Sequence, residues 1–141
     1  MKVKKTIPSL VISFGLVFGF SSAISFAAPL DRGVQGGWSE IDGYFTVGSS
    51  NHFAALSSDE PDSHTGTVES RERGNVIEER VVGETYWDGI YHYTRARFEN
   101  IFTGSAKADS GRIYGWDHTI AYSSWLGDPI EFVGKTYYGK G

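Results

Sequence analysis

Hydrophobic and polar residues alternate most clearly between residues 90 and 102. One face of this segment would carry Ile90, His92, Thr94, Ala96, Phe98 and Phe102. The other face would carry Tyr91, Tyr93, Arg95, Arg97 and Glu99. A period of two in a segment rich in aromatic and β-branched residues predicts a β-strand.

Two further alternating segments follow, over residues 112–125 and 130–138. Turn signals precede each of them, at 109–111 (Asp-Ser-Gly) and 126–129 (Leu-Gly-Asp-Pro). We therefore predict a three-stranded antiparallel meander over 90–138. The middle strand would place Tyr114, Trp116, His118, Ile120 and Tyr122 on one face. We assign this aromatic face to the core, so Trp116 and Phe98 should both be largely buried.

The chain upstream also favours strands. Residues 38–47, with Gly43 inside, predict a bent strand that 51–56 continues, and residues 64–69 and 75–82 predict a hairpin across Gly74. Short strands at close spacing are typical of all-β sandwiches and small barrels. The predicted fold class is therefore all-β: a small antiparallel sandwich or barrel of about six or seven strands.

The first 27 residues have the order of a secretory signal peptide. Lys2, Lys4 and Lys5 precede an apolar stretch over 7–20, and small residues lead to Ser25-Phe26-Ala27. A membrane anchor would need about 20 continuous apolar residues, and this run is shorter. We predict a signal helix over 1–27 that is cleaved between Ala27 and Ala28. A single secreted domain, 28–141, would remain, with no membrane span.

Charge and cysteine content limit the possible partners and the possible sources of stability. Removal of the three signal lysines and no acidic residue would take the net charge from −4 to −7. An acidic protein is a poor partner for nucleic acid, whose non-specific binding depends on Lys and Arg. The chain has no cysteine, so its stability cannot come from disulfides. An exported chain without cysteine also fits a Gram-positive bacterial secretome.

No pattern predicts catalysis, a metal or a cofactor. The histidines of the predicted mature part, His52, His64, His92 and His118, have no zinc-ligand spacing. His92 and His118 could point to one sheet face, as a pair or as two partly buried strand residues. Asp59, Glu60 and Asp62 crowd one loop but lack the spacing of a calcium loop. The usual serine nucleophile motif is missing, and an acidic pair of the glycosidase kind carries no specific signal.

The best-defined candidate surface is the strand face that bears Tyr91, Tyr93, Arg95 and Arg97. Phenol rings and guanidinium groups in a row can stack on sugar rings and pair with anions. This face predicts a binding site for an anionic or sugar-containing ligand. The alternative is a solvated sheet face, on which the arginines pair with Glu99, Glu131 or Asp117.

Short features at the two ends of the predicted domain suggest a family. Gly36-Gly37-Trp38 stands near the predicted mature N-terminus and Tyr137-Tyr138 near the C-terminus. With its strand-rich sequence and lack of cysteine, the chain resembles small exported bacteriocins of the lactococcin 972 type. It departs from that family in its length and acidity, and no functional residue is carried over.

Three functions remain open at this point. The first is a secreted, non-catalytic β domain that binds an extracellular or cell-surface ligand, such as a glycan. The second, implied by the resemblance, is a bacteriocin-like protein that acts on competing cells. The third and least supported is a secreted hydrolase. The oligomeric state is left open.

Overall fold

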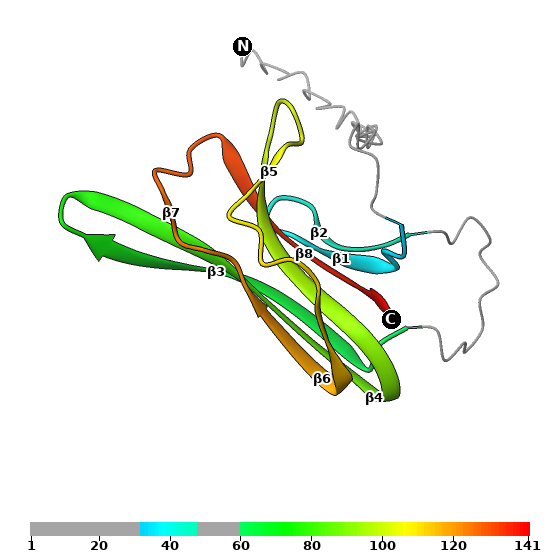
Figure 1. The fold of residues 1–141 in the computed structure, drawn as a ribbon. Helices are drawn as coiled ribbons and strands as arrows, with labels where there is room; N and C mark the ends of the chain where they lie inside the picture. Colours follow the sequence, from blue (N-terminus) through cyan, green and yellow to red (C-terminus); the bar gives the residue numbers. More distant parts are fainter. Residues whose placement is uncertain (1–31, 48–59) are drawn as a thin grey trace, which may run out of the picture.

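The computed structural model describes residues 32–47 and 60–141, and all of its regular structure is β. Its eight strands form one antiparallel sheet that curls into a half-barrel (Figure 1). The all-β prediction is therefore confirmed. Within the described ranges no helix could cross a membrane. The predicted signal segment and the predicted strand 51–56 lie outside the described residues.

The spine of the sheet is β4 (Val76–Asn100), a strand of 25 residues, far longer than the usual three to ten. β3 (Ser63–Arg73) pairs with its first half and β8 (Phe132–Lys140) with its second half. β6 (Ile113–Tyr122) pairs across the middle, on the opposite side of β4 from both. Two short strands, β5 (Ala106–Lys107) and β7 (Leu126–Gly127), also pair with β4.

The predicted meander over 90–138 is therefore wrong in its strand order. β4 lies between β6 and β8, whereas a meander would have placed β6 in the middle. The reason is the length of β4. Its ladder with β3 ends at the pair of Ser63 with Tyr86, which leaves the second half of that edge open, and β8 fills it.

Of the predictions for the chain before β4, one is confirmed and one is wrong. The hairpin across Gly74 is confirmed, with Gly74 at a φ of 66° in the turn between β3 and β4. The single bent strand over 38–47 is wrong, because the segment is a hairpin of β1 (Gly36–Ser39) and β2 (Gly43–Thr46). Ser39 bonds to Asp42 within the turn, and β1 pairs onward with β8.

A sharp bend in β4 produces the curl. The register of β4 against β6 jumps from Trp87 opposite Asp117 to Tyr91 opposite Trp116. Gly89 and Asp117 both have positive φ here, 68° and 62°. The Gly89 N–H donates to Asp117 Oδ1 at 2.7 Å, which joins the two strands at the bend. Because β6 folds together with β4, the sheet closes over its own inner face.

The inner face carries mostly small or polar side chains. From β4 it buries Val81, Thr85, Trp87, His92, Thr94, Ala96 and Phe98, and from β6 Thr119 and Ala121. Space there is tight: a Cβ on Gly83 would lie 2.9 Å from Thr136 Cγ2 and 3.0 Å from Thr94 Cγ2. Beside Gly83 the concave surface therefore has no room for a larger side chain.

Phe98 is fully buried, as predicted, but Trp116 is 64% exposed, so its predicted burial is wrong. The two faces of β6 were assigned the wrong way round. The inward face carries Gly115, Thr119 and Ala121, whose small side chains fit the concave side, and the aromatic face points outward.

Polar side chains in the interior form a chain of hydrogen bonds that includes His64. Its Nδ1 lies 2.8 Å from Thr85 Oγ1 and its Nε2 2.7 Å from Thr136 Oγ1. Thr94 Oγ1 continues the chain, at 2.6 Å from both Thr85 Oγ1 and Thr119 Oγ1. Burial lowers the pKa of His64 to about 4, so the ring is neutral at ordinary pH.

Candidate functional site

Three large aromatic side chains lie together on the outer face of the bend. Tyr91 of β4 stacks on Tyr114 of β6, with ring centroids 5.8 Å apart and planes 16° apart. The ring of Trp116 lies 5.4 Å from that of Tyr91. Their exposed fractions are 43% for Tyr91, 45% for Tyr114 and 64% for Trp116. We call these three residues the aromatic patch.

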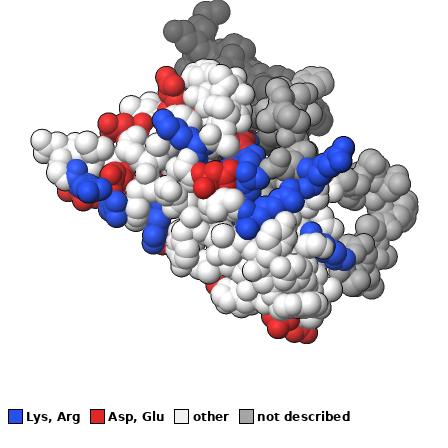
Figure 2. Space-filling model, in the orientation of Figure 1, with Lys and Arg blue, Asp and Glu red and all other residues white. Residues whose placement is uncertain are grey.

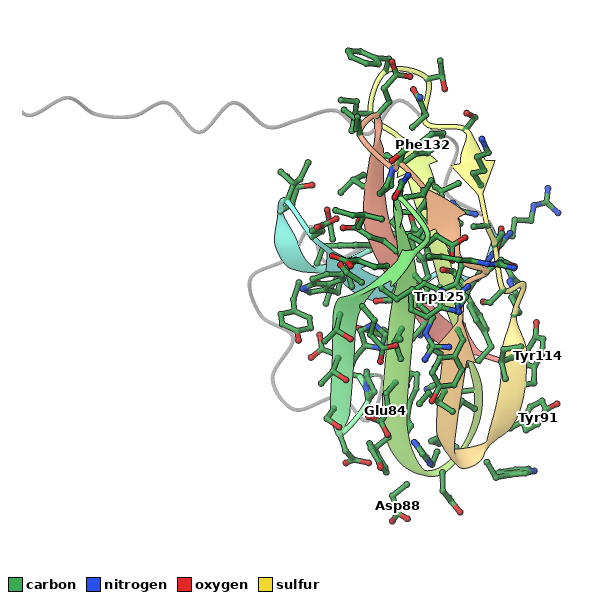
Figure 3. All side chains as sticks on the ribbon, turned by 90° about the vertical axis from the view of Figure 1, so that its left-hand side faces the viewer. Glu84, Asp88, Tyr91, Tyr114, Trp125 and Phe132 are labelled. Carbon is green, nitrogen blue, oxygen red and sulfur yellow. The ribbon has the colours of Figure 1, made fainter. Side chains whose placement is uncertain are left out.

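The pairing of the strands explains why the patch forms. Trp116 stands opposite Tyr91, and Tyr114 stands opposite Tyr93, so all of these side chains leave the sheet on one side. Figure 3 shows Tyr91 and Tyr114 projecting from the outer side of the sheet near the bend. In Figure 2 the surface over β6 and the bend of β4 is largely free of charge.

Aromatic side chains continue along the outer face beyond the bend. Tyr86 stacks on His118 with centroids 4.2 Å apart and planes 6° apart, and Glu84 accepts hydrogen bonds from Tyr86 and His118. At the far end, Trp125 lies between the guanidinium groups of Arg71 and Arg80, at 4.0 and 4.8 Å from its ring centroid. Ring contacts therefore continue along β6 and into the segment that follows it.

Of the four predicted ligand-binding residues, Tyr91 belongs to the patch and Tyr93 lies beneath it. Tyr93 is fully buried, and its ring contacts Tyr114 at 5.5 Å on one side. The guanidinium of Arg112 lies 4.6 Å from the centroid of the same ring. The Tyr93 hydroxyl donates to the carbonyl oxygen of Gly33 at 3.1 Å. Tyr93 therefore supports the patch from below.

The two arginines of the predicted strip are held by carboxylates. Arg95 Nη2 lies 2.5 Å from Asp109 Oδ2, and Arg97 Nη2 lies 2.6 Å from Glu99 Oε1. The pairing of Arg97 with Glu99 is the one that the alternative of a structural sheet face predicted. The partner of Arg95 is Asp109, which lies in the loop after β5 and was expected only as part of a turn.

Glu99 is the centre of a buried charged cluster. Burial alone would raise its pKa, but hydrogen bonds from Tyr137, Lys135 and Arg97 outweigh it and hold the pKa below its ordinary value. Lys135 Nζ lies 2.9 Å from Glu99 Oε2, and both side chains are at most 10% exposed. Burial, together with the neighbouring Glu99, raises the pKa of Tyr137. This cluster stabilises the sheet and leaves little of the two arginines to a ligand.

Of the two alternatives for His92 and His118, a pair on one sheet face does not occur, and His92 is instead a buried strand residue. His92 points inward and is fully buried, with Nδ1 2.8 Å from the carbonyl oxygen of Ile90. His118 points outward, to Glu84. The bend offsets the two strands so that His118 stands opposite Tyr86 and His92 opposite Gly115. His52 lies outside the described residues.

The acidic residues near Pro61 take separate roles. Asp62 Oδ2 accepts the N–H of Asp88 at 2.7 Å and thereby ties the start of β3 to the bend of β4. Glu60 lies at the rim of a cleft beside β2. Asp59 is outside the described residues. Across 32–47 and 60–141 no group of three or more His, Asp or Glu side chains is arranged to hold a metal ion.

Comparison of the chain with protein-family models, with curated proteins and with solved structures gives no match. The resemblance to bacteriocins therefore stays a prediction. The arrangement of the described residues carries the functional argument, and the aromatic patch is its most distinctive element.

Proposed function

We propose that the protein is a secreted, non-catalytic β module that binds a glycan at an extracellular or cell surface through the aromatic patch. The observation that carries this proposal is the exposure of Tyr91, Tyr114 and Trp116 on two adjacent strands. Contiguous exposed rings are uncommon on a protein surface without a partner.

The chemistry of the patch favours sugars. One side of a sugar ring presents C–H groups and packs on the flat, apolar face of an aromatic ring, while its hydroxyls need hydrogen-bonding partners at the edge. Tyrosine and tryptophan supply both, with large area at low cost in conformational entropy. The Tyr91 and Tyr114 rings lie nearly parallel and come from paired strands, so the platform is already ordered before a ligand arrives.

In this proposal Tyr91 contacts the ligand directly. Tyr93 holds the ring of Tyr114 in place, and Arg95 and Arg97 belong to the ion pairs that stabilise the second half of β4. The exposed rings of Tyr86 on β4 and Tyr122 on β6, with the carboxylate of Glu84, would extend the site toward a longer chain of sugars.

Export is the other part of the proposal, and it rests on the signal sequence over 1–27. Cleavage after Ala27 would release the domain into the medium. N-terminal sequencing of protein recovered from culture medium tests it, and we expect Ala28 as the first residue. A first residue of Met1, or protein found only in the membrane fraction, would contradict export.

The binding proposal is tested by pull-down of the purified protein on insoluble chitin, cellulose and peptidoglycan, and by affinity electrophoresis through soluble mannan and dextran. We expect retention on at least one glycan, and its loss in the double variant Tyr91→Ala/Trp116→Ala. The matched control is Phe102→Ala, another exposed aromatic, 77% exposed in the turn after β4. Absence of retention by the parent on every glycan, or equal loss in the control, would contradict the proposal.

A further inference from the structure

A cleft opens between the β1–β2 hairpin, β8 and the start of β3. Its volume is about 280 Å³, at the small end of ligand sites, which usually occupy about 300–1,000 Å³. The lining residues come from four parts of the chain: Gly37, Tyr44, Phe45, Thr46, Glu60, Pro61, His64 and Tyr138. A site of this size suits a small molecule or a headgroup, in contrast to the extended outer face of β6.

The charge of the cleft is negative. Of its eight lining residues, all in the described part of the chain, Glu60 is the one that carries a charge at neutral pH. His64 is neutral there, because burial lowers its pKa to about 4 and its two ring nitrogens face Thr85 and Thr136. Glu60 and Tyr138 line the same cleft. Burial raises the pKa of Tyr138, and the negative charge of Glu60 raises it further.

Aromatic rings line the same cleft as the carboxylate. Tyr44 on β2 is 63% exposed, whereas Tyr138 on β8 is 5% exposed and its ring lies 4.8 Å from that of His64. The faces of aromatic rings attract cations, and the attraction grows where water is partly excluded. A cleft lined by one carboxylate and by aromatic rings is a combination that recognises organic ammonium groups.

We propose that this cleft binds a small organic cation, with Glu60 as the counter-charge and Tyr44 and Tyr138 as ring contacts. Anions are disfavoured by Glu60. Divalent metal ions are disfavoured as well, because calcium needs about six to eight oxygen ligands and the lining offers one carboxylate. The site is independent of the aromatic patch, since the two share no residue.

Titration with choline tests the proposal, because choline carries a fixed positive charge at every pH. The matched neutral probe is 3,3-dimethylbutan-1-ol, which has the same shape with carbon in place of nitrogen. Chemical shifts of the purified protein during each titration report both affinity and location. We expect choline to bind with a millimolar Kd and the neutral probe at least about fivefold more weakly.

Two variants locate the site. Glu60→Gln should weaken choline binding at least about fivefold, and Tyr44→Ala by a smaller factor of about two to five. Both residues are exposed, so the fold should be preserved. Glu72→Gln, at the distant end of β3, is the control and should bind choline as the parent does. Equal binding of the two probes, or full choline binding by Glu60→Gln, would overturn the proposal. So would the absence of any shift in the Tyr138 signals at 50 mM choline, a concentration that corresponds to a binding free energy of roughly −2 kcal/mol.

Discussion

The two faces of the β4–β6 sheet differ in how they place their large side chains. The inner face carries mostly glycine, alanine and threonine around His64, with Trp87 and Phe98 as its large buried rings. The outer face carries Tyr91, Tyr114 and Trp116, each more than two-fifths exposed. In an ordinary sheet the large apolar side chains lie mainly on the buried face, and here three of them also stand exposed on the outer face.

Curvature accounts for this difference. Side chains on the concave side converge as the sheet closes, so small and hydrogen-bonded residues fit there. Side chains on the convex side spread apart, which leaves room for rings. The comparison separates stability from binding: the inner face and the buried Glu99 cluster should control the free energy of unfolding, and the exposed aromatic patch should control ligand affinity.

The largest expected effect on stability comes from Phe98→Ala. Removal of a fully buried ring should lower the free energy of unfolding by about 3–5 kcal/mol, because the rigid sheet cannot close the cavity. Urea unfolding followed by circular dichroism measures it. A loss below about 1 kcal/mol would show that Phe98 is not part of the core that stabilises the protein.

Glu99→Gln should come next, with a loss of about 3 kcal/mol. The substitution leaves Lys135 and Arg97 without their shared counter-charge at a site that is almost fully buried. The control is Glu69→Gln, which removes the exposed partner of Arg80 and should cost less than about 1 kcal/mol. Similar losses in the two variants would mean that the buried cluster contributes no more than a surface pair.

The buried His64 predicts a pH dependence. Its pKa is about 4 in the folded protein and near 6.5 when unfolded, so the unfolded state takes up the proton first as pH falls. Stability is therefore complete above pH 6.5 and declines toward pH 4, by about 2 kcal/mol between pH 6.5 and 5.

Urea unfolding at several pH values measures this slope. His64→Gln should flatten it, because glutamine takes up no proton in this pH range. The pKa values of Glu99 and Asp109 lie below their ordinary values of 4.5 and 3.8, so those carboxylates add to the slope only at lower pH. A slope that persists in His64→Gln would contradict the assignment.

Gly83→Ala tests how tightly the inner face is packed. The added methyl group would press on Thr136 and Thr94, and we expect a loss of about 1–3 kcal/mol. Adding Thr136→Ser removes the nearer methyl group while keeping the hydroxyl that faces His64, so it should restore part of the stability. An unchanged midpoint in Gly83→Ala would mean that the curl is looser than the structure shows.

The sequence was sufficient for the strand class and for the β3–β4 hairpin, because alternation and the Gly74 turn are local signals. It was insufficient for the direction of the β6 faces. Alternation shows that Trp116 and Thr119 point to opposite sides, but only the curl of the whole sheet decides which side is inside. A useful signal was present: Gly115, Thr119 and Ala121 form a face too small for a flat sheet core.

The candidate site shows the same limit. Tyr91, Tyr93, Arg95 and Arg97 alternate as a strand face should, yet the loop after β5 covers the arginines with Asp109 and Arg112 covers Tyr93. Contacts of this kind join residues far apart in the chain, and no local pattern indicates them. The rings of β6 that complete the aromatic patch became visible as a surface only once their face was known to point outward.

The most direct test of the central claim is the affinity of Trp116→Ala for the glycan that retains the parent, measured together with its free energy of unfolding. The account predicts that stability changes by less than about 1 kcal/mol, because the ring is mainly in water, while binding weakens at least about tenfold. Unchanged binding, or a stability loss of about 3 kcal/mol or more, would place Trp116 in the scaffold and contradict the separation of the two faces.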